Sequence, residues 1–255
     1  MQITFLGTGT SSGVPMIACD CSVCSSPDPH DKRLRSSILI RSATTTLVID
    51  TTPDFRYQML RENNKQLDAV LFTHPHKDHV AGLDDIRAYN FFQQKPMEVY
   101  ANAMTIAALK REFQYAFEEV KYAGVPEIHL HEIDETPFTI GDIPVIPVPV
   151  WHARMRVFGY RIGSFSYITD ANKIDEEQKE KIRGSSVLVL NALRKEKHIA
   201  HFTLDEAIDL ANELEVPQVY LTHISHQLGR HGDVSALLPP HIQLAHDGLT
   251  LTAHI

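Results

Sequence analysis

The hexapeptide HPHKDH at residues 74–79 constrains this chain more than any other stretch of its sequence. It directly follows LDAVLFT, an apolar run that predicts a buried strand. Imidazoles and carboxylates are good ligands for Zn, Mn or Fe. Because successive side chains at a turn diverge, one ion cannot easily take all four groups. Two neighbouring ions fit better, one bound by His74 and His76 and the other by Asp78 and His79. The competing interpretation is a solvated polar loop.

Two ions need further ligands, which are expected where other strands end. His152 follows IPVIPVPVW, Asp170 follows FSYIT, and His223 follows QVYLT. Taken singly, each is as well explained by a satisfied histidine or a capping aspartate. Their repeated position after strand-like runs makes them candidate ligands of one shared centre.

All three cysteines, Cys19, Cys21 and Cys24, lie in the stretch MIACDCSVC. An odd number clustered so tightly cannot form a disulfide framework. The cluster therefore predicts metal binding in a reducing compartment, the cytoplasm, with ordinary loop thiols as the alternative. The opening MQITFLGTGT lacks the basic and apolar segments of a signal peptide, and no apolar run is long enough to span a membrane.

The composition indicates a globular protein that acts on a small molecule. The chain has 255 residues, which suits a single domain over residues 1–255 with a sizeable core. Its net charge of −8 disfavours a long nucleic acid, because such partners are usually met by a basic face.

Apolar runs rich in β-branched residues predict the strands, namely ITFLG, SSILIRS, TTLVID, LDAVLFT, MEVYAN, IPVIPVPV, FGYRIG, FSYITD, VLVLNAL and QVYLTH. Helices are predicted to open at Thr52-Pro53, to run from Asp84 toward Phe92 and from Thr105 to Tyr122, and to follow the TLDE capping box at Thr203. The segment IQLAHDGLTLTAHI predicts a hairpin that turns at Asp247-Gly248. This mixture favours an α+β protein with two sheets packed face to face and helices outside.

HPHKDH followed by Val80-Ala81-Gly82, with His152, Asp170 and His223 further on, resembles the metallo-β-lactamase superfamily. The resemblance spans nearly the whole chain and implies an αββα sandwich with a dinuclear centre along one edge. It assigns His74, His76 and His152 to one ion, Asp78, His79 and His223 to the other, and Asp170 to both as a bridge.

Two further motifs narrow the resemblance. The opening FLGTGTSSG is similar to the tRNA 3′-processing endonucleases (RNase Z), and MIACDCSVC is similar to the PhnP-like cyclic phosphodiesterases. The second likeness implies an extra zinc ion held by Cys19, Cys21, Cys24 and a histidine. His226 is the best fourth ligand, with His231 as the fallback. Three thiolates and one imidazole make a closed tetrahedral zinc site, so its role is expected to be structural.

The resemblance implies a hydrolase for small phosphodiesters or cyclic phosphates of the phosphoribosyl 1,2-cyclic phosphate type. Two Zn or Mn ions would activate a water molecule, with Asp78 among the catalytic residues. His201 precedes the capped helix and is predicted to act as general acid or as a phosphate ligand. His198 and Arg194 are weaker candidates for substrate contacts, since a surface arginine explains Arg194 equally well. Asp50 ends TTLVID and is a candidate partner of a metal-bound histidine, or else a turn residue.

Two other functions remain open at this point. A tRNA 3′-processing endonuclease usually carries a long Gly/Pro-rich arm, which the sequence lacks, and the acidic charge also disfavours it. A non-hydrolytic metal-binding protein resembling PqqB of PQQ biosynthesis often lacks ligands in its catalytic loop, whereas every expected ligand is present in this chain. The expected partner is thus a small phosphodiester, and a homodimer is common among such relatives.

Overall fold

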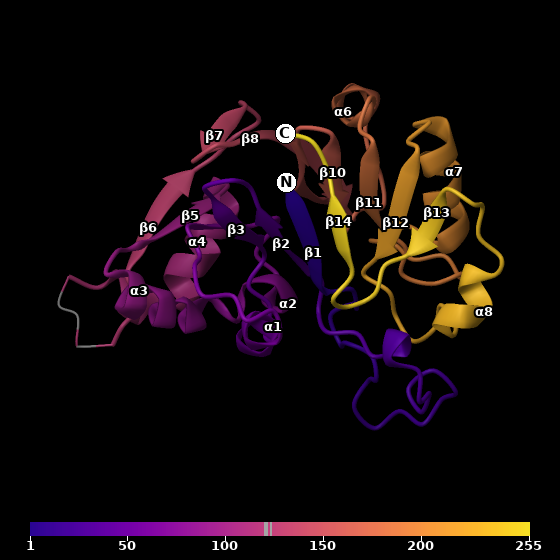
Figure 1. The fold of residues 1–255 in the computed structure, drawn as a ribbon, viewed down its shortest axis with the longest axis horizontal. Coiled ribbons are helices and arrows are strands. Elements are labelled where there is room, and N and C mark those ends of the chain that lie inside the picture. The colour runs from indigo at the N-terminus through magenta and orange to yellow at the C-terminus, as the bar shows by residue number, and fades with distance from the viewer. Residues whose placement is uncertain (120–121, 123) are drawn as a thin grey trace.

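The computed structural model describes residues 1–119, 122 and 124–255. Its strands form two seven-stranded sheets that pack face to face, with helices on both outer faces (Figure 1). The predicted sandwich of two sheets is confirmed. The two chain ends lie side by side, because the Met1 amino group donates a hydrogen bond to the Ala253 carbonyl at 2.7 Å.

The first sheet has the strand order β14-β1-β2-β3-β4-β5-β6. The bounds in that order are Thr250–Thr252, Gln2–Gly7, Ser37–Arg41, Thr46–Ile49, Ala69–Leu71, Met97–Ala101 and Ile128–Glu132. Strands β3 to β6 pair in parallel, so their carboxyl ends lie along one edge of the sheet.

The second sheet has the order β13-β12-β11-β10-β9-β8-β7. Its bounds in that order are Ile242–Leu244, Gln218–Thr222, Val187–Asn191, Phe165–Ile168, Met155–Ile162, Ile143–His152 and Phe138–Ile140. Strands β10 to β13 are parallel, and β9 is antiparallel to both β10 and β8. Strand β8 therefore runs in the same direction as β10, β11 and β12.

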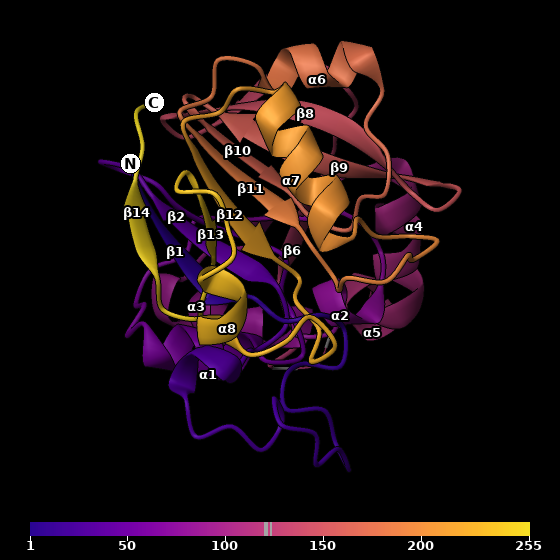
Figure 2. The same cartoon turned by 90° about the vertical axis from the view of Figure 1, so that its right-hand side faces the viewer.

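The helices divide between the two outer faces. Those from the first half of the chain are α1 (Phe55–Arg61), α2 (Lys77–Val80), α3 (Arg87–Gln93), α4 (Ala103–Glu112) and α5 (Gln114–Phe117), with the 3₁₀ turn Leu83–Ile86. A second 3₁₀ turn, Pro29–Asp31, lies in the N-terminal loop. The others are α6 (Glu176–Ile182), α7 (Leu204–Glu213) and α8 (His231–Ser235). Figure 2 shows α7 lying across the outer face of the second sheet. In the part of the chain that the structure describes, no helix combines the length and apolar character that crossing a bilayer requires.

Most of the core of the described residues lies in three apolar layers. The central layer lies between the sheets and includes the fully buried Phe5, Tyr160 and Phe165. Period-2 alternation divides each strand between layers. Met97 and Val99 of β5, for example, face the helices of the first sheet. On the other side, Ala207 of α7 packs on the second sheet.

The predicted hairpin at Asp247-Gly248 is wrong. Strand β13 pairs with β12 in the second sheet, whereas β14 pairs with β1 in the first. The turn instead crosses between the sheets and is held by Asp247, whose carboxylate accepts hydrogen bonds from Leu34 N and Thr8 Oγ1, each at 2.8 Å. The alternating pattern identified the strands, but strand partners depend on contacts far away in sequence.

Helix positions were predicted less well than strand positions. The helix expected at Thr52-Pro53 begins at Phe55, because the Thr52 hydroxyl accepts a hydrogen bond from Asp54 N in a turn before the helix. The helix expected over 105–122 is α4 followed by the short α5, which ends at Phe117, and residues 120 and 121 of that range lie outside the described residues. The capping box at Thr203 is confirmed and opens α7. Strands β6 and β7 were not predicted.

Candidate metal centre

The predicted ligands gather where strands end. The loop after β4 and the one-turn helix α2 carry the residues of HPHKDH, namely His74, His76, Asp78 and His79. The second sheet contributes His152 as the last residue of β8, Asp170 two residues after β10, and His223 directly after β12. Since β8, β10 and β12 run in the same direction, their carboxyl ends meet at one edge. This topology explains how residues 149 positions apart in sequence, His74 and His223, reach one place.

Two groups of side chains in this place have the composition and spacing of metal ligands. The first is His74, His76 and His152, and the second is Asp78, His79, Asp170 and His223. Within each group, one potential ligand atom per residue lies within 4.8 Å of every other. The groups adjoin, since the rings of His74 and His79 are 4.2 Å apart. The division matches the assignment that the family resemblance implied.

Asp170 occupies the position expected of a bridge. Its Oδ2 lies 3.2 Å from His79 Nε2 and 3.3 Å from His223 Nδ1. Asp170 also belongs to a third group of potential ligand atoms, with His152 and His201. This carboxylate is therefore close to residues of both ligand groups.

A buried network orients the imidazoles. The Asp50 carboxylate accepts hydrogen bonds from His79 Nδ1 at 2.7 Å and from the Thr73 hydroxyl at 2.8 Å. Since the Thr73 hydroxyl donates to Asp50, it accepts from His74 Nδ1, 2.9 Å away. His152 Nδ1 donates to the Ala200 carbonyl at 2.9 Å. In each of these three histidines the Nδ1 proton is engaged, which leaves Nε2 to bind a metal.

Backbone strain accompanies the centre. Asp50, Asp170 and His223 all have positive φ angles, of 66°, 55° and 57°. Non-glycine residues adopt this left-handed conformation rarely and at a cost, although Asp and His tolerate it better than bulky residues. Each of the three turns the chain sharply after a strand.

The donor set fits divalent cations. Neither His79 Nε2 nor His223 Nδ1 has a hydrogen-bond partner among the described residues, although both atoms are buried. Both nitrogens face carboxylate oxygens, and lone pairs on neighbouring acceptors repel unless a cation or a proton lies between them. Burial disfavours an imidazolium at His79, yet the carboxylates of Asp78, Asp170 and Asp50 outweigh that effect and raise its pKa well above the usual range. This concentration of buried negative charge calls for a cation.

The loop between β11 and α7 brings His201 to the centre. Its ring lies 4.8 Å from that of His152 and 4.9 Å from that of His223, and its Nδ1 is buried without a hydrogen-bond partner among the described residues. Burial, followed by the neighbouring His223, lowers the pKa of His201 to about 3. His201 is thus available to contact a bound molecule.

The other two candidates of this loop lie further out. The ring of His198 is 5.0 Å from that of His201, and its Nδ1 accepts a hydrogen bond from Ala200 N. The Arg194 guanidinium donates to the carbonyls of Glu196 and Lys197 and to Gln227 Oε1, which braces the loop. A substrate contact by either residue stays a prediction.

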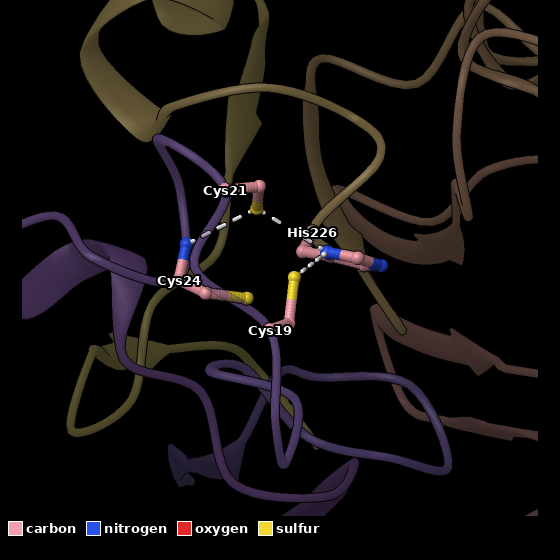
Figure 3. Close-up of side chains that lie close together, drawn as sticks. All are labelled: Cys19, Cys21, Cys24 and His226. Atoms are coloured by element: carbon pink, nitrogen blue, oxygen red, sulfur yellow. Dashed lines mark hydrogen bonds between the residues drawn. The ribbon is translucent and has the colours of Figure 1, made fainter.

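The three cysteines meet His226 in a separate cluster (Figure 3). His226 Nδ1 lies 3.3 Å from Cys19 Sγ and 3.4 Å from Cys21 Sγ. Backbone N–H groups also point at sulfur, that of Met16 at Cys24 and that of Cys24 at Cys21. The cluster fits a structural metal site. The fallback ligand His231 lies elsewhere, stacked on His30 and beside Arg33.

Sequence reasoning identified Asp50 as the partner of a ligand histidine, but it missed the other residues that support the ligands. Thr10 lies in the stretch FLGTGTSSG, and its hydroxyl is 3.3 Å from His223 Nε2. The Thr73 hydroxyl forms hydrogen bonds with both Asp50 and His74 and so links them. The Asn191 side chain holds the turn after Asp170 through hydrogen bonds to both backbone groups of Ala171, at 2.8 and 3.0 Å. A hydroxyl beside a predicted ligand was the only signal for Thr73, and Asn191 had none.

Comparison with known proteins places this architecture in a family. Residues 45–224 match the model of the beta-lactamase superfamily domain. A solved structure described as a new diphosphatase from the PhnP family is 42% identical, covers 100% of this chain and 98% of its own, and superposes with a TM-score of 0.94. Zn²⁺-bound PqqB from Methylobacterium extorquens is 21% identical, with 99% and 100% coverage and a TM-score of 0.79, and so shares the fold.

One curated relative is named for a transferase and not for a hydrolase. The octanoyltransferase of Porphyromonas gingivalis is 39% identical over 252 residues, which are 98% of this chain and 51% of that protein. The chain thus spans about half the length of this relative, whose name describes the whole protein.

The chain belongs to the metallo-β-lactamase superfamily of hydrolases. Within that superfamily it is PhnP-like.

Proposed function

We propose that this chain is a dinuclear metal-dependent phosphodiesterase that hydrolyses small phosphodiesters or cyclic phosphates. The observation that carries the proposal is the meeting of two ligand groups around Asp170, with all seven predicted ligands present. Bound at these groups, two zinc or manganese ions supply a Lewis-acid pair that makes water more acidic and neutralises charge on phosphoryl oxygens.

The chain's own residues prepare the reaction. Asp50 and Thr73 fix the imidazoles so that the ligand groups need no reorganisation when substrate arrives. Asp78 is the more accessible carboxylate, with 14% of its side chain exposed against 3% for Asp170. Asp78 is therefore the carboxylate suited to orient the attacking water, whereas the more deeply buried Asp170 would serve to hold the ions.

His201 completes the site on the side of the loop after β11. Its side chain is 11% exposed and lies beside histidines of both ligand groups. From this position an imidazole N–H can donate to a phosphoryl oxygen or to the departing alkoxide. The residue thus contacts substrate in either role.

The substrate class is supported by charge and by likeness. The net charge of −8 disfavours tRNA, whose binding requires neutralised phosphates. The solved structure that is 42% identical is described as a diphosphatase. A phosphoanhydride bond is therefore a further candidate for the bond that is cleaved. The name octanoyltransferase adds an octanoyl thioester as a competitor. The thiols of Cys19, Cys21 and Cys24 lie in a ligand group of their own, apart from the two groups around Asp170.

The test is a substrate panel with purified protein loaded with zinc or manganese. It contains bis(p-nitrophenyl) phosphate, cyclic ribose phosphates, a nucleoside diphosphate ester, a precursor tRNA at several salt concentrations and an octanoyl thioester. We expect turnover of the small phosphodiesters, abolished by a chelator and by His79→Ala. Cleavage of the thioester alone, or of tRNA with a steep salt dependence, would overturn the proposal in favour of another reaction.

A further inference from the structure

Glu98, His129 and His131 form a side-chain cluster in another part of the fold. Glu98 lies on β5 and the two histidines on β6, which is the outer edge strand of the first sheet (Figure 1). The residues of the candidate metal centre follow other strands, in particular β4, β8, β10 and β12. We call this cluster the edge site.

Strand geometry brings the three side chains together. His129 and His131 are two residues apart, so they project from the same face of β6. In the parallel pairing of β5 with β6, Glu98 is opposite His129. Ile128 and Leu130 point the other way, into the apolar layer beneath the helices. The positions of the three side chains are therefore set by the strand pairing, as are those of the core residues of β6.

Both imidazoles turn toward one carboxylate oxygen. Oε2 of Glu98 lies 3.1 Å from His129 Nδ1 and also contacts His131 Nε2. The three ligand atoms lie within 4.8 Å of one another, and the two rings are 4.5 Å apart. A ring that stacks on an aromatic neighbour has little rotational freedom, and His131 stacks on Tyr100 at 4.4 Å and 12°. Tyr100 in turn stacks on Phe138 of β7.

We propose that the edge site binds a zinc ion through Glu98, His129 and His131. Two imidazoles and one carboxylate are a recurrent set of protein ligands for zinc, and three protein ligands leave a fourth position for water. The side chains are between 33% and 62% exposed, which lets an ion enter from solvent.

A zinc ion at this position would join β6 to β5. An edge strand has a neighbour on one side only, so β6 is held in the sheet by its pairing with β5 alone. Because the ion binds the folded arrangement and not the unfolded chain, it stabilises the protein by mass action. The role is therefore structural and independent of the proposed hydrolysis.

The test compares zinc stoichiometry between matched variants. Wild type, the double variant His129→Asn/His131→Asn and the control His254→Asn are dialysed against the same free zinc concentration, and bound zinc is counted by mass spectrometry. His254 is an exposed histidine near the chain end. We expect wild type and His254→Asn to hold one more zinc ion per chain than the double variant, with a melting temperature raised by about 3 °C on zinc addition.

Since the comparison is a difference, zinc at the other two clusters cancels. Glu98→Gln keeps both imidazoles and serves as a second variant, in which we expect zinc to bind at least about tenfold more weakly. Equal zinc content in wild type and the double variant, or an unchanged affinity in Glu98→Gln, would overturn the proposal. Phosphodiester hydrolysis should be the same in all four proteins, so this test does not depend on the proposed function.

Discussion

Asp50 Oδ2 and His79 Nδ1 lie 2.7 Å apart, and both side chains are almost wholly buried. The same carboxylate reaches His74 through the Thr73 hydroxyl. One buried aspartate thus orients a histidine in each of the two ligand groups. Any change at Asp50 should therefore affect both groups together.

Replacing Asp50 by Asn tests this coupling. The amide removes the negative charge that polarises the His79 imidazole, so we expect zinc affinity at the centre to fall about 10- to 100-fold. Competition with a coloured chelator measures it. Asp68→Asn is the matched control, because Asp68 precedes β4 but pairs with Lys95. Unchanged affinity in Asp50→Asn would contradict the role assigned to this carboxylate.

The sequence carried the ligands of the centre and one supporting residue, Asp50, whose predicted hydrogen bond to a ligand histidine is made with His79, but not the other supporting residues. Polar residues directly after apolar runs predict strand-end positions, which is why His152, Asp170 and His223 could be grouped. Thr10 and Asn191 could not, because their contacts depend on chain crossings that no local pattern encodes. The pairing of the last two strands was predicted wrongly for the same reason.

The edge site escaped sequence analysis on similar grounds. Single histidines in an alternating stretch such as EIHLHE have no local partner that would mark them as ligands. Only the pairing of β5 with β6 reveals Glu98 beside them. The spacing of a motif reveals ligands that lie in one turn. Ligands on neighbouring strands can be recognised only once the register of the sheet is known.

Gly82→Ala should damage the centre through the backbone. A Cβ at Gly82 would lie 2.1 Å from the Thr52 carbonyl oxygen and 2.7 Å from Phe55 Cβ. The turn that carries His79 must then move, and we expect a loss of about 1–3 kcal/mol in unfolding free energy together with weaker zinc binding. Gly232→Ala in α8 is the control, since its Cβ would meet nothing within 4 Å. Chemical denaturation measures the unfolding free energy of the two variants. Equal values would contradict the argument.

His201→Ala should separate the two roles proposed for this histidine. We expect a fall in kcat of about 10²–10⁴-fold with unchanged metal content. A general acid matters most for a poor leaving group, so its loss should be far greater with a cyclic ribose phosphate than with bis(p-nitrophenyl) phosphate. If His201 instead binds the phosphate, its loss should lower kcat equally for both substrates. Full activity on both substrates would remove His201 from the reaction.

The cysteine cluster predicts a zinc ion whose role is structural and not catalytic. Cys21→Ser removes one of the four candidate ligands that join the N-terminal loop to His226 (Figure 3). We expect one zinc ion fewer per chain and a melting temperature lower by more than about 5 °C, because a closed structural site contributes directly to folding. Ser22→Ala, a neighbouring exposed position, is the control.

Cys21→Ser should also weaken zinc binding at the candidate metal centre. Thr10 contacts His223 and lies on the segment that leads into this loop, so loosening the loop removes a support of the second ligand group. Wild-type zinc content in Cys21→Ser would exclude the structural ion. Reduced zinc content with an unchanged melting temperature would show that the ion does not hold the loop.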